Sequence, residues 1–126
     1  MKTIVSSGQA ARPVGHYSQA VRAGDFVYVS GQGPVDAQGQ LVPGDIKEQT
    51  RLVLNNIRVI LEAAGATLQD VVKCGVFLND IGDFAAMNDV YREVFGPNPP
   101  ARTTVGATLP KILVEIDAVA YTGPAR

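Results

Sequence analysis

The residues best suited to chemistry lie near the end of the sequence. Arg102 stands at the start of the segment ARTTVGATLPKILVEIDAVAY, residues 101–121, and Glu115 and Asp117 lie inside its apolar second half. A guanidinium presents a planar, permanently charged fork that matches a carboxylate. A carboxylate in a partly dry cleft can orient a water molecule and accept its proton. The segment therefore combines a group that can bind an acid with a group that can activate water.

These residues also have structural interpretations. The charge of Arg102 can simply end a strand, and Glu115 can be a solvated glutamate on a strand face. For Arg102 the residue type alone favours neither interpretation. Asp117 lies two residues beyond Glu115 on the same face, and we interpret it as a surface or interface acid. Cys74, in an apolar strand with no visible partner, is interpreted as a small core residue.

Composition excludes several classes of function. The chain has 126 residues, which suits one domain, and a formal net charge of −1 with scattered Lys and Arg, which argues against nucleic-acid binding. It has one histidine and one cysteine, without the spacing of a metal site, and no glycine-rich nucleotide motif. We therefore expect no metal and no nucleotide cofactor. The sequence shows no signal peptide or membrane span, so we expect a cytoplasmic protein with no membrane partner.

The elements that must position these residues follow from hydrophobic periodicity. Asp45 is expected to cap a long amphipathic helix that Gly65 ends. The order is β-β-α-β-α-β-β, an α+β pattern. The expected elements are a hairpin in 19–31, a helix over 45–64, a strand over 70–79, a helix over 83–95 and two strands within 101–121.

Side-chain alternation gives the expected sheet two different faces. One face is apolar and should lie under both helices. Two helices cannot cover both sides of one sheet, so the mixed face is left to water, which predicts a homo-oligomer that buries it. Glu115 would then lie at or near a subunit boundary. The covered face comprises Ile112, Val114, Ile116, Ala118 and Ala120 with Val72, Cys74, Val76 and Leu78, and the uncovered face includes Phe26, Tyr28, Phe77, Leu113, Val119 and Tyr121.

Five motifs resemble the RidA/YjgF family of imine deaminases: GHYSQAV (15–21), VSGQGPVD (29–36), PPARTTVG (99–106), LP (109–110) and VEIDAVA (114–120). The resemblance covers nearly the whole chain. It implies a single chorismate-mutase-like α+β domain over residues 1–126, with a mixed sheet and two helices on one face. It also implies a homotrimer with small-molecule sites between subunits.

The family's activity is the hydrolysis of reactive enamines and imines of the 2-aminoacrylate type to 2-keto acids and ammonia, with no metal and no organic cofactor. By resemblance, Arg102 binds the substrate carboxylate and Glu115 is the acidic catalytic residue. Tyr17 matches a position whose hydroxyl can bond the water or the leaving nitrogen. Ser30, Gly31 and Thr104 match substrate-binding positions.

Three departures from the family pattern affect these expectations. His16 stands where the family usually has proline, before Tyr17. Thr104 replaces a cysteine of some members, which excludes thiol chemistry there and leaves a backbone contact with substrate. The run from Arg102 to Glu115 is about two residues shorter than usual in the active branch, an even change that keeps strand parity.

The sequence leaves three functions open and disfavours a fourth. The first is general clearance of 2-aminoacrylate, and the second is a pathway-specific deaminase with the same pocket. The third is a regulatory trimer that binds keto acids without turnover, although the retention of Arg102 and Glu115 counts against it. RNA cleavage, attributed to some relatives, is disfavoured by the acidic balance of the chain.

Overall fold

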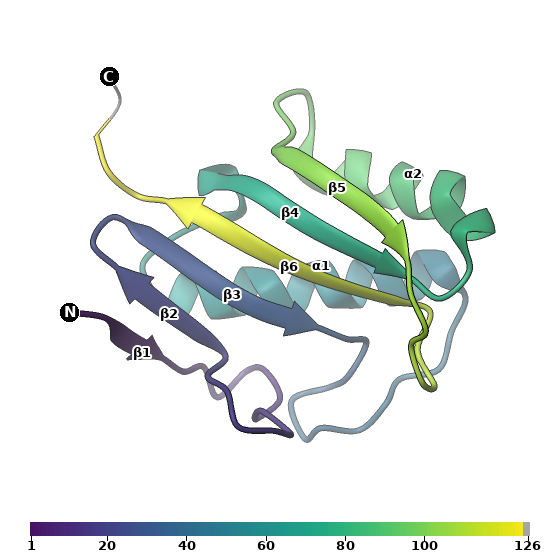
Figure 1. Ribbon diagram of the computed structural model, residues 1–126, viewed down its shortest axis with the longest axis horizontal. Coiled ribbons are helices and arrows are strands. Elements are labelled where there is room, and N and C mark those ends of the chain that lie inside the picture. The colour runs from purple at the N-terminus through teal and green to yellow at the C-terminus, as the bar shows by residue number, and fades with distance from the viewer. Residues whose placement is uncertain (125–126) are drawn as a thin grey trace.

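The computed structural model describes residues 1–124, in which one sheet carries two helices (Figure 1). Two short 3₁₀ helices, at Leu68–Asp70 and Ile81–Asp83, precede β4 and α2. The elements are β1 (Thr3–Val5), β2 (Ala20–Ala23), β3 (Phe26–Gln32), α1 (Ile46–Ala63), β4 (Val71–Leu78), α2 (Phe84–Phe95), β5 (Ala101–Gly106) and β6 (Val114–Tyr121).

The six strands lie in the order β1-β2-β3-β6-β4-β5. All neighbours pair antiparallel except β4 and β5, which are parallel. The mixed sheet and the two helices confirm the α+β class. The short β1, which pairs with β2, adds a strand to the predicted order. Because β4 lies between β5 and β6, the two strands of residues 101–121 do not touch each other.

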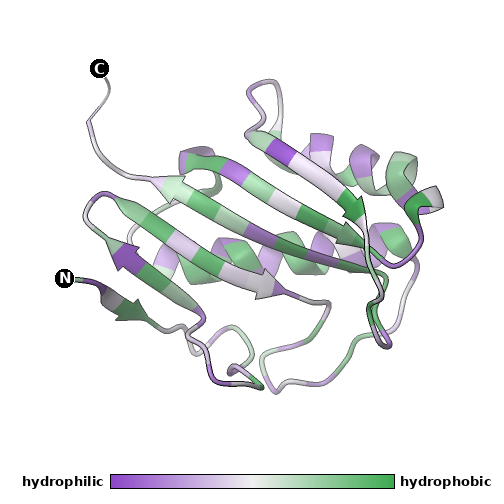
Figure 2. Cartoon of the chain, in the orientation of Figure 1, coloured by the Kyte–Doolittle hydropathy of each residue, from purple (hydrophilic) through white to green (hydrophobic). Residues whose placement is uncertain are grey.

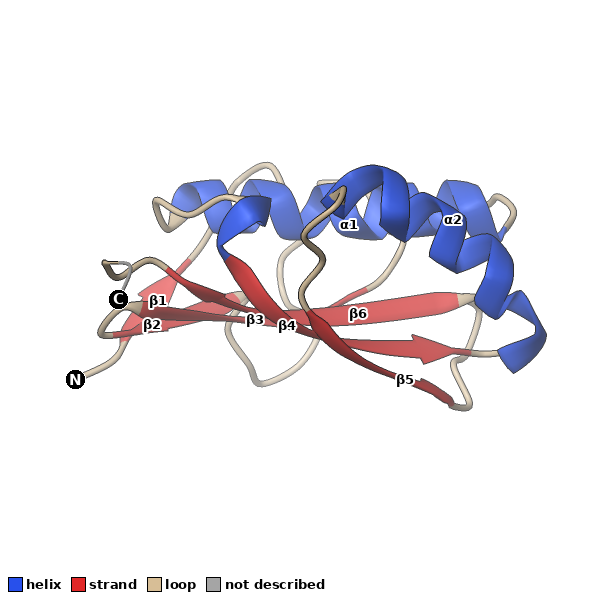
Figure 3. Cartoon of the chain, turned by 90° about the horizontal axis from the view of Figure 1, so that it is seen from above, coloured by secondary structure: helices blue, strands red, loops and turns tan. Residues whose placement is uncertain are grey.

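Both helices lie on the same side of the sheet, and its other side is left uncovered (Figure 3). Helix α1 begins as predicted, because Asp45 accepts a hydrogen bond from the Glu48 backbone while Glu48 reaches back to the Asp45 backbone. It ends just before Gly65, whose φ of 78° is a left-handed conformation that suits glycine. Val53, Leu54, Ile57, Ile60 and Leu61 of this helix are buried against the sheet.

The predicted core face of the sheet is confirmed except at two residues, Val72 and Ile112. In β6, the alternate residues from Val114 to Ala120 are buried, and so are Cys74, Val76 and Leu78 in β4. Val72 was placed on this face wrongly: the β4–β6 register shifts between Val71 and Lys73, which turns Val71 inward and leaves Val72 45% exposed. Ile112 precedes β6 and is only partly buried.

The uncovered face carries apolar side chains, as the alternation predicts. Figure 2, viewed from this side, shows apolar and polar positions mixed along β3, β4 and β6. Phe26 and Tyr28 are exposed, and the Phe26 ring lies 5.1 Å from the ring of Tyr121. Leu113 is an exception, because it packs against the core beneath the helices.

Candidate active site

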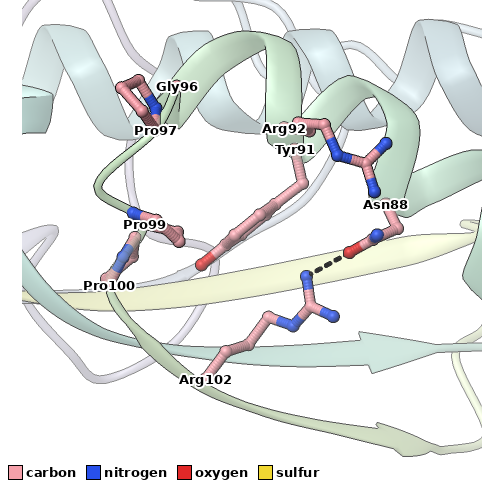
Figure 4. A pocket seen from close by; sticks show the side chains of 8 residues that line it. All are labelled: Asn88, Tyr91, Arg92, Gly96, Pro97, Pro99, Pro100 and Arg102. Carbon is pink, nitrogen blue, oxygen red and sulfur yellow. Dashed lines mark hydrogen bonds between the residues drawn. The ribbon is translucent and has the colours of Figure 1, made fainter.

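Arg102 lies on β5 opposite Cys74, so its side chain extends to the helix side of the sheet. Its Nη1 donates a hydrogen bond to Oδ1 of Asn88 at 2.8 Å (Figure 4). The guanidinium carbon lies 4.6 Å from the ring centroid of Tyr91 and 5.3 Å from that of Phe84. These three partners stand at i, i+4 and i+7 on α2, so one stripe of the helix holds the guanidinium.

The arrangement leaves part of Arg102 free for a ligand. Asn88 engages Nη1, and the aromatic rings pack on the guanidinium without using its N–H groups. Within residues 1–124, no carboxylate forms an ion pair with Arg102. The edge that carries Nε and Nη2 therefore remains available for two parallel hydrogen bonds to one carboxylate.

The sequence prediction missed Phe84 and Asn88 as functional residues. Phe84 has the same apolar helical spacing as Met87 and Tyr91, which are buried, but it is 42% exposed and stacks on Arg102 of the edge strand β5. The sequence indicates Asn88 only weakly as a functional residue: it is a polar residue four positions after Phe84 in an otherwise apolar stripe.

A cavity of about 760 Å³ opens beside Arg102 (Figure 4). Its lining contains two guanidinium groups and no carboxylate; Arg92 pairs with Asp89 at 3.4 Å outside the lining, so the unpaired positive charge that favours an anionic ligand is that of Arg102. The prolines that follow α2 form its opposite side. The residues that line it are Asn88, Tyr91, Arg92, Gly96, Pro97, Pro99, Pro100 and Arg102.

The other polar groups beneath this cavity are neutral at physiological pH. Burial raises the pKa of the Cys74 thiol to about 11 and also raises the pKa of the Tyr91 hydroxyl. The hydroxyls of Tyr91 and Thr104 are buried and have no hydrogen-bond partner within residues 1–124. Thr104 stands two residues after Arg102 on the same side of β5, and Cys74 is a core residue as predicted.

A second cluster lies on the uncovered side of the sheet. Tyr17, Gly31 and Glu115 line a cavity of about 180 Å³ together with Arg12. Glu115 alternates with the buried residues of β6 and is half-buried. Three of the predicted site residues therefore meet here, and Arg12 joins them as a residue that the sequence analysis did not single out.

The carboxylate of Glu115 occupies space that is open because residue 31 is a glycine. The register between β3 and β6 shifts between Val29 and Gln32, which brings the backbone at Gly31 against the side chain of Glu115. A Cβ atom at Gly31 would lie 2.8 Å from Oε2 of Glu115, closer than such atoms approach. The absence of a side chain at Gly31 thus lets the acid lie along β3.

Tyr17 and Ser30 are held by the loop before β2. The Tyr17 hydroxyl accepts a hydrogen bond from the Val14 backbone at 3.3 Å, which leaves its own proton free to be donated. The Ser30 hydroxyl donates to the Ser18 carbonyl at 2.6 Å and is not among the groups that line either cavity. Ser30 therefore joins β3 to this loop.

The two clusters are not brought together within the chain. Arg102 faces the helices from β5, whereas Glu115 faces away from them on β6, with β4 between the two strands. Each cluster thus contains about half of the predicted site residues. Arg102, Asn88 and Thr104 form one half, and Tyr17, Gly31 and Glu115 form the other.

The comparisons with known proteins identify the family. The family model described as Endoribonuclease L-PSP matches residues 7–122. The chain belongs to the RidA/YjgF family. Among members with solved structures, RidA from the Antarctic bacterium Psychrobacter is 42% identical, with a TM-score of 0.90 over 94% of this chain and 98% of that one.

Curated relatives carry two kinds of name. A RutC family protein of Pyrococcus horikoshii is 52% identical over 124 residues, which cover 96% of this chain and 98% of the relative. The 2-iminobutanoate/2-iminopropanoate deaminase of Capra hircus is 46% identical over 127 residues, which cover 98% of this chain and 93% of the relative. The similarity in both cases includes the segments that carry the two clusters.

The described residues contain neither a helix that could span a membrane nor a candidate cluster of metal ligands. No helix within residues 1–124 combines the length and apolar character needed to span a membrane. In the same residues, no group of three or more His, Cys, Asp and Glu side chains is placed to hold a metal ion.

Proposed function

We propose that this protein hydrolyses 2-imino acids and their enamine tautomers to 2-keto acids and ammonia. The observation that carries the proposal is the free edge of Arg102, held open beside an anion-favouring cavity by Asn88, Tyr91 and Phe84. The 46% identity to a 2-iminobutanoate/2-iminopropanoate deaminase supports the same chemistry.

Arg102 binds the substrate carboxylate in this proposal. The stacked guanidinium cannot rotate freely, so its Nε and Nη2 groups hold the carboxylate in one plane and fix the direction of the adjoining C=N bond. Asn88 accepts from Nη1 and so holds the guanidinium from the side away from this edge. Thr104, two residues further along β5, contacts the substrate through its backbone, because its hydroxyl is buried.

Glu115 directs water to the imine carbon. The carboxylate accepts a proton as the water oxygen bonds to carbon, and the nitrogen then receives this proton and leaves as ammonia. The C=N bond is replaced by C=O, and both protons of the water end on nitrogen, so no oxidant or reductant is required. Tyr17 can donate its hydroxyl proton to the leaving nitrogen or hold the water.

The two halves of the site join between protomers in a homotrimer. The helix-side edge of one protomer, at β5, meets the uncovered sheet face of the next, at Glu115. A contact between two different surfaces is heterologous, and it closes into a ring when repeated by rotation. The exposed Phe26, Tyr28 and Val105 on the uncovered side support such burial. Light scattering should give the mass of three chains.

Activity is tested with 2-aminoacrylate generated from serine by a dehydratase. The wild-type protein should speed the loss of the imine, and Arg102→Ala should reduce kcat/KM by about 100-fold or more, the cost of a charged, paired contact. Arg58→Ala is the matched control, because Arg58 is a half-exposed arginine that pairs with Glu62 on α1, away from both clusters. Keto-acid binding with no turnover would instead indicate a regulatory binding protein.

Mixed trimers test whether the site is shared. Arg102→Ala and Glu115→Gln protomers are each expected to be inactive alone. After unfolding and refolding together in equal amounts, about one quarter of the sites should combine an intact Arg102 with an intact Glu115 from the neighbour. A mixture that stays inactive, although each variant assembles, would contradict the shared site.

A further inference from the structure

Arg12 is a charged residue that the proposed reaction does not use. Arg12 and Glu115 are the two charged residues among those that line the smaller cavity. Within residues 1–124, the guanidinium of Arg12 has no ion-pair or hydrogen-bond partner. An unpaired cation therefore stands in the same cavity wall as the proposed catalytic acid.

The backbone that carries Arg12 is anchored on both sides. Gln19 is 4% exposed, and its amide donates to the carbonyls of Ala10 at 3.3 Å and Ala11 at 2.8 Å. Pro13 follows Arg12 and fixes its own φ. These contacts fix the backbone from which the exposed Arg12 side chain extends, so that recognition by Arg12 has to order its side chain but not the loop.

We propose that Arg12 determines substrate specificity by binding a second acidic group, so that the preferred substrates are dicarboxylic 2-imino acids of the 2-iminosuccinate or 2-iminoglutarate type. This inference rests on the proposed function. The carboxylate beside the imine binds Arg102 of one protomer. The imine carbon faces Glu115 of the next, and the distal carboxylate reaches Arg12 in the same cavity as Glu115.

The reaction itself is unchanged by the second acid. Water adds to the C=N carbon, ammonia leaves and the distal carboxylate takes no part, so 2-iminosuccinate gives oxaloacetate. Arg12 touches only the part of the substrate that distinguishes dicarboxylic from monocarboxylic imines. Its removal should therefore affect the two substrate classes differently, whereas loss of Glu115 should affect both.

The test compares two imines made in place by amino-acid oxidases. 2-Iminosuccinate is produced from aspartate and 2-iminobutanoate from 2-aminobutanoate, and semicarbazide competes for each so that kcat/KM of hydrolysis can be measured. We expect Arg12→Ala to lower kcat/KM for 2-iminosuccinate by about 10- to 100-fold, as for loss of a charged hydrogen bond. Its value for 2-iminobutanoate should stay within about twofold. Arg12→Lys should restore part of the loss.

Two controls distinguish recognition of the distal carboxylate from the general effect of removing one positive charge. Arg58→Ala removes the same charge from a half-exposed position on α1 and should leave kcat/KM for both substrates unchanged. Calorimetry of the products gives a readout without turnover, and Arg12→Ala should weaken the binding of oxaloacetate but not of 2-oxobutanoate.

Three outcomes of these experiments test the inference about Arg12 and distinguish its failure from that of the proposed function. An equal loss of kcat/KM for both imines in Arg12→Ala would overturn the inference, because Arg12 would then influence the shared acid Glu115 and would not recognise the distal carboxylate. No change for either imine or either product would overturn it as well. If the wild type hydrolyses neither imine, the proposed function fails, and Arg12-dependent binding of oxaloacetate would still support the recognition of a second acid.

Discussion

The carboxylate of Glu115 lies against the backbone of Gly31, in the space that any other residue at position 31 would fill with its side chain. The Cβ of an alanine there would meet Oε2 at 2.8 Å, with the Cδ of the same carboxyl group at 2.9 Å. The position of the acid is therefore set by the neighbouring strand as well as by β6.

Gly31→Ala should displace Glu115 and lower kcat. The methyl group must push the carboxylate away from β3, and a misplacement of about 1 Å can cost on the order of 100-fold in rate. Imine hydrolysis and the free energy of unfolding should be measured together. Gly8→Ala is the control, because a Cβ at Gly8 meets nothing within 4 Å. A variant that folds normally and keeps full kcat would contradict this role for Gly31.

Replacement of Phe84 should weaken acid binding through Arg102. Phe84→Leu removes a ring from an exposed position, so folding should be retained, and loss of the cation–π contact should raise KM about 2- to 5-fold. Phe84→Tyr keeps a ring and should stay close to wild type. Calorimetry with 2-oxobutanoate checks the mechanism: the effect of Phe84→Leu should vanish when Arg102 is already alanine.

Asn88→Asp should be more harmful than Asn88→Ala. The aspartate would pair with Arg102 and compete with the substrate carboxylate for the guanidinium, whereas alanine removes only the bond that orients Nη1. We expect KM to rise about tenfold or more for Asn88→Asp and less for Asn88→Ala. Equal KM values for the two variants would show that Asn88 does not control access to Arg102.

The stability of the fold should fall at alkaline pH because of Cys74. Its thiol has a pKa of about 11 in the folded protein against an ordinary value of 9.0, so the folded state holds the proton more tightly than the unfolded state. This contribution is fully present below pH 9 and is lost as the pH rises towards 11, at about 1.4 kcal/mol per unit. Tyr91 acts in the same direction at higher pH.

Denaturant unfolding from pH 8 to 11 measures this loss. Cys74→Ala should unfold with a shallower pH dependence than the wild type, even though the cavity it leaves lowers stability at every pH. Parallel curves for the two proteins would show that the buried thiol does not contribute to the alkaline transition.

Much of the fold could be predicted because its signals are local. Asp45 and Gly65 mark the ends of α1, and alternation in 114–120 identifies the buried face of β6. Val72 could not be placed from its own strand, because the register shift that turns it outward is a property of the β4–β6 pair. The strand Thr3–Val5 is too short to give a periodic signal.

The residues of the candidate site also fall into two groups: those that could be proposed from the sequence, and those that only the structure brings into the site. Arg102, Glu115 and Tyr17 could be proposed from residue type and motif, and these predictions await the mutants above. The contact of Phe84 with Arg102 depends on α2 crossing the edge of the sheet, and an apolar residue at a helix edge has the same periodicity as a core residue. The sequence motifs alone did not single out Arg12.

The strand β6 lies between β3 and β4 and joins the two parts of the sheet, although it follows both of them in the sequence. During synthesis, the N-terminal hairpin and the β4–β5 pair have no strand between them until β6 has left the ribosomal exit tunnel. The sheet can therefore close only after residues 114–121 have emerged. We expect truncations that remove this strand to abolish folding as a whole, so that chains interrupted before it yield no partly folded product.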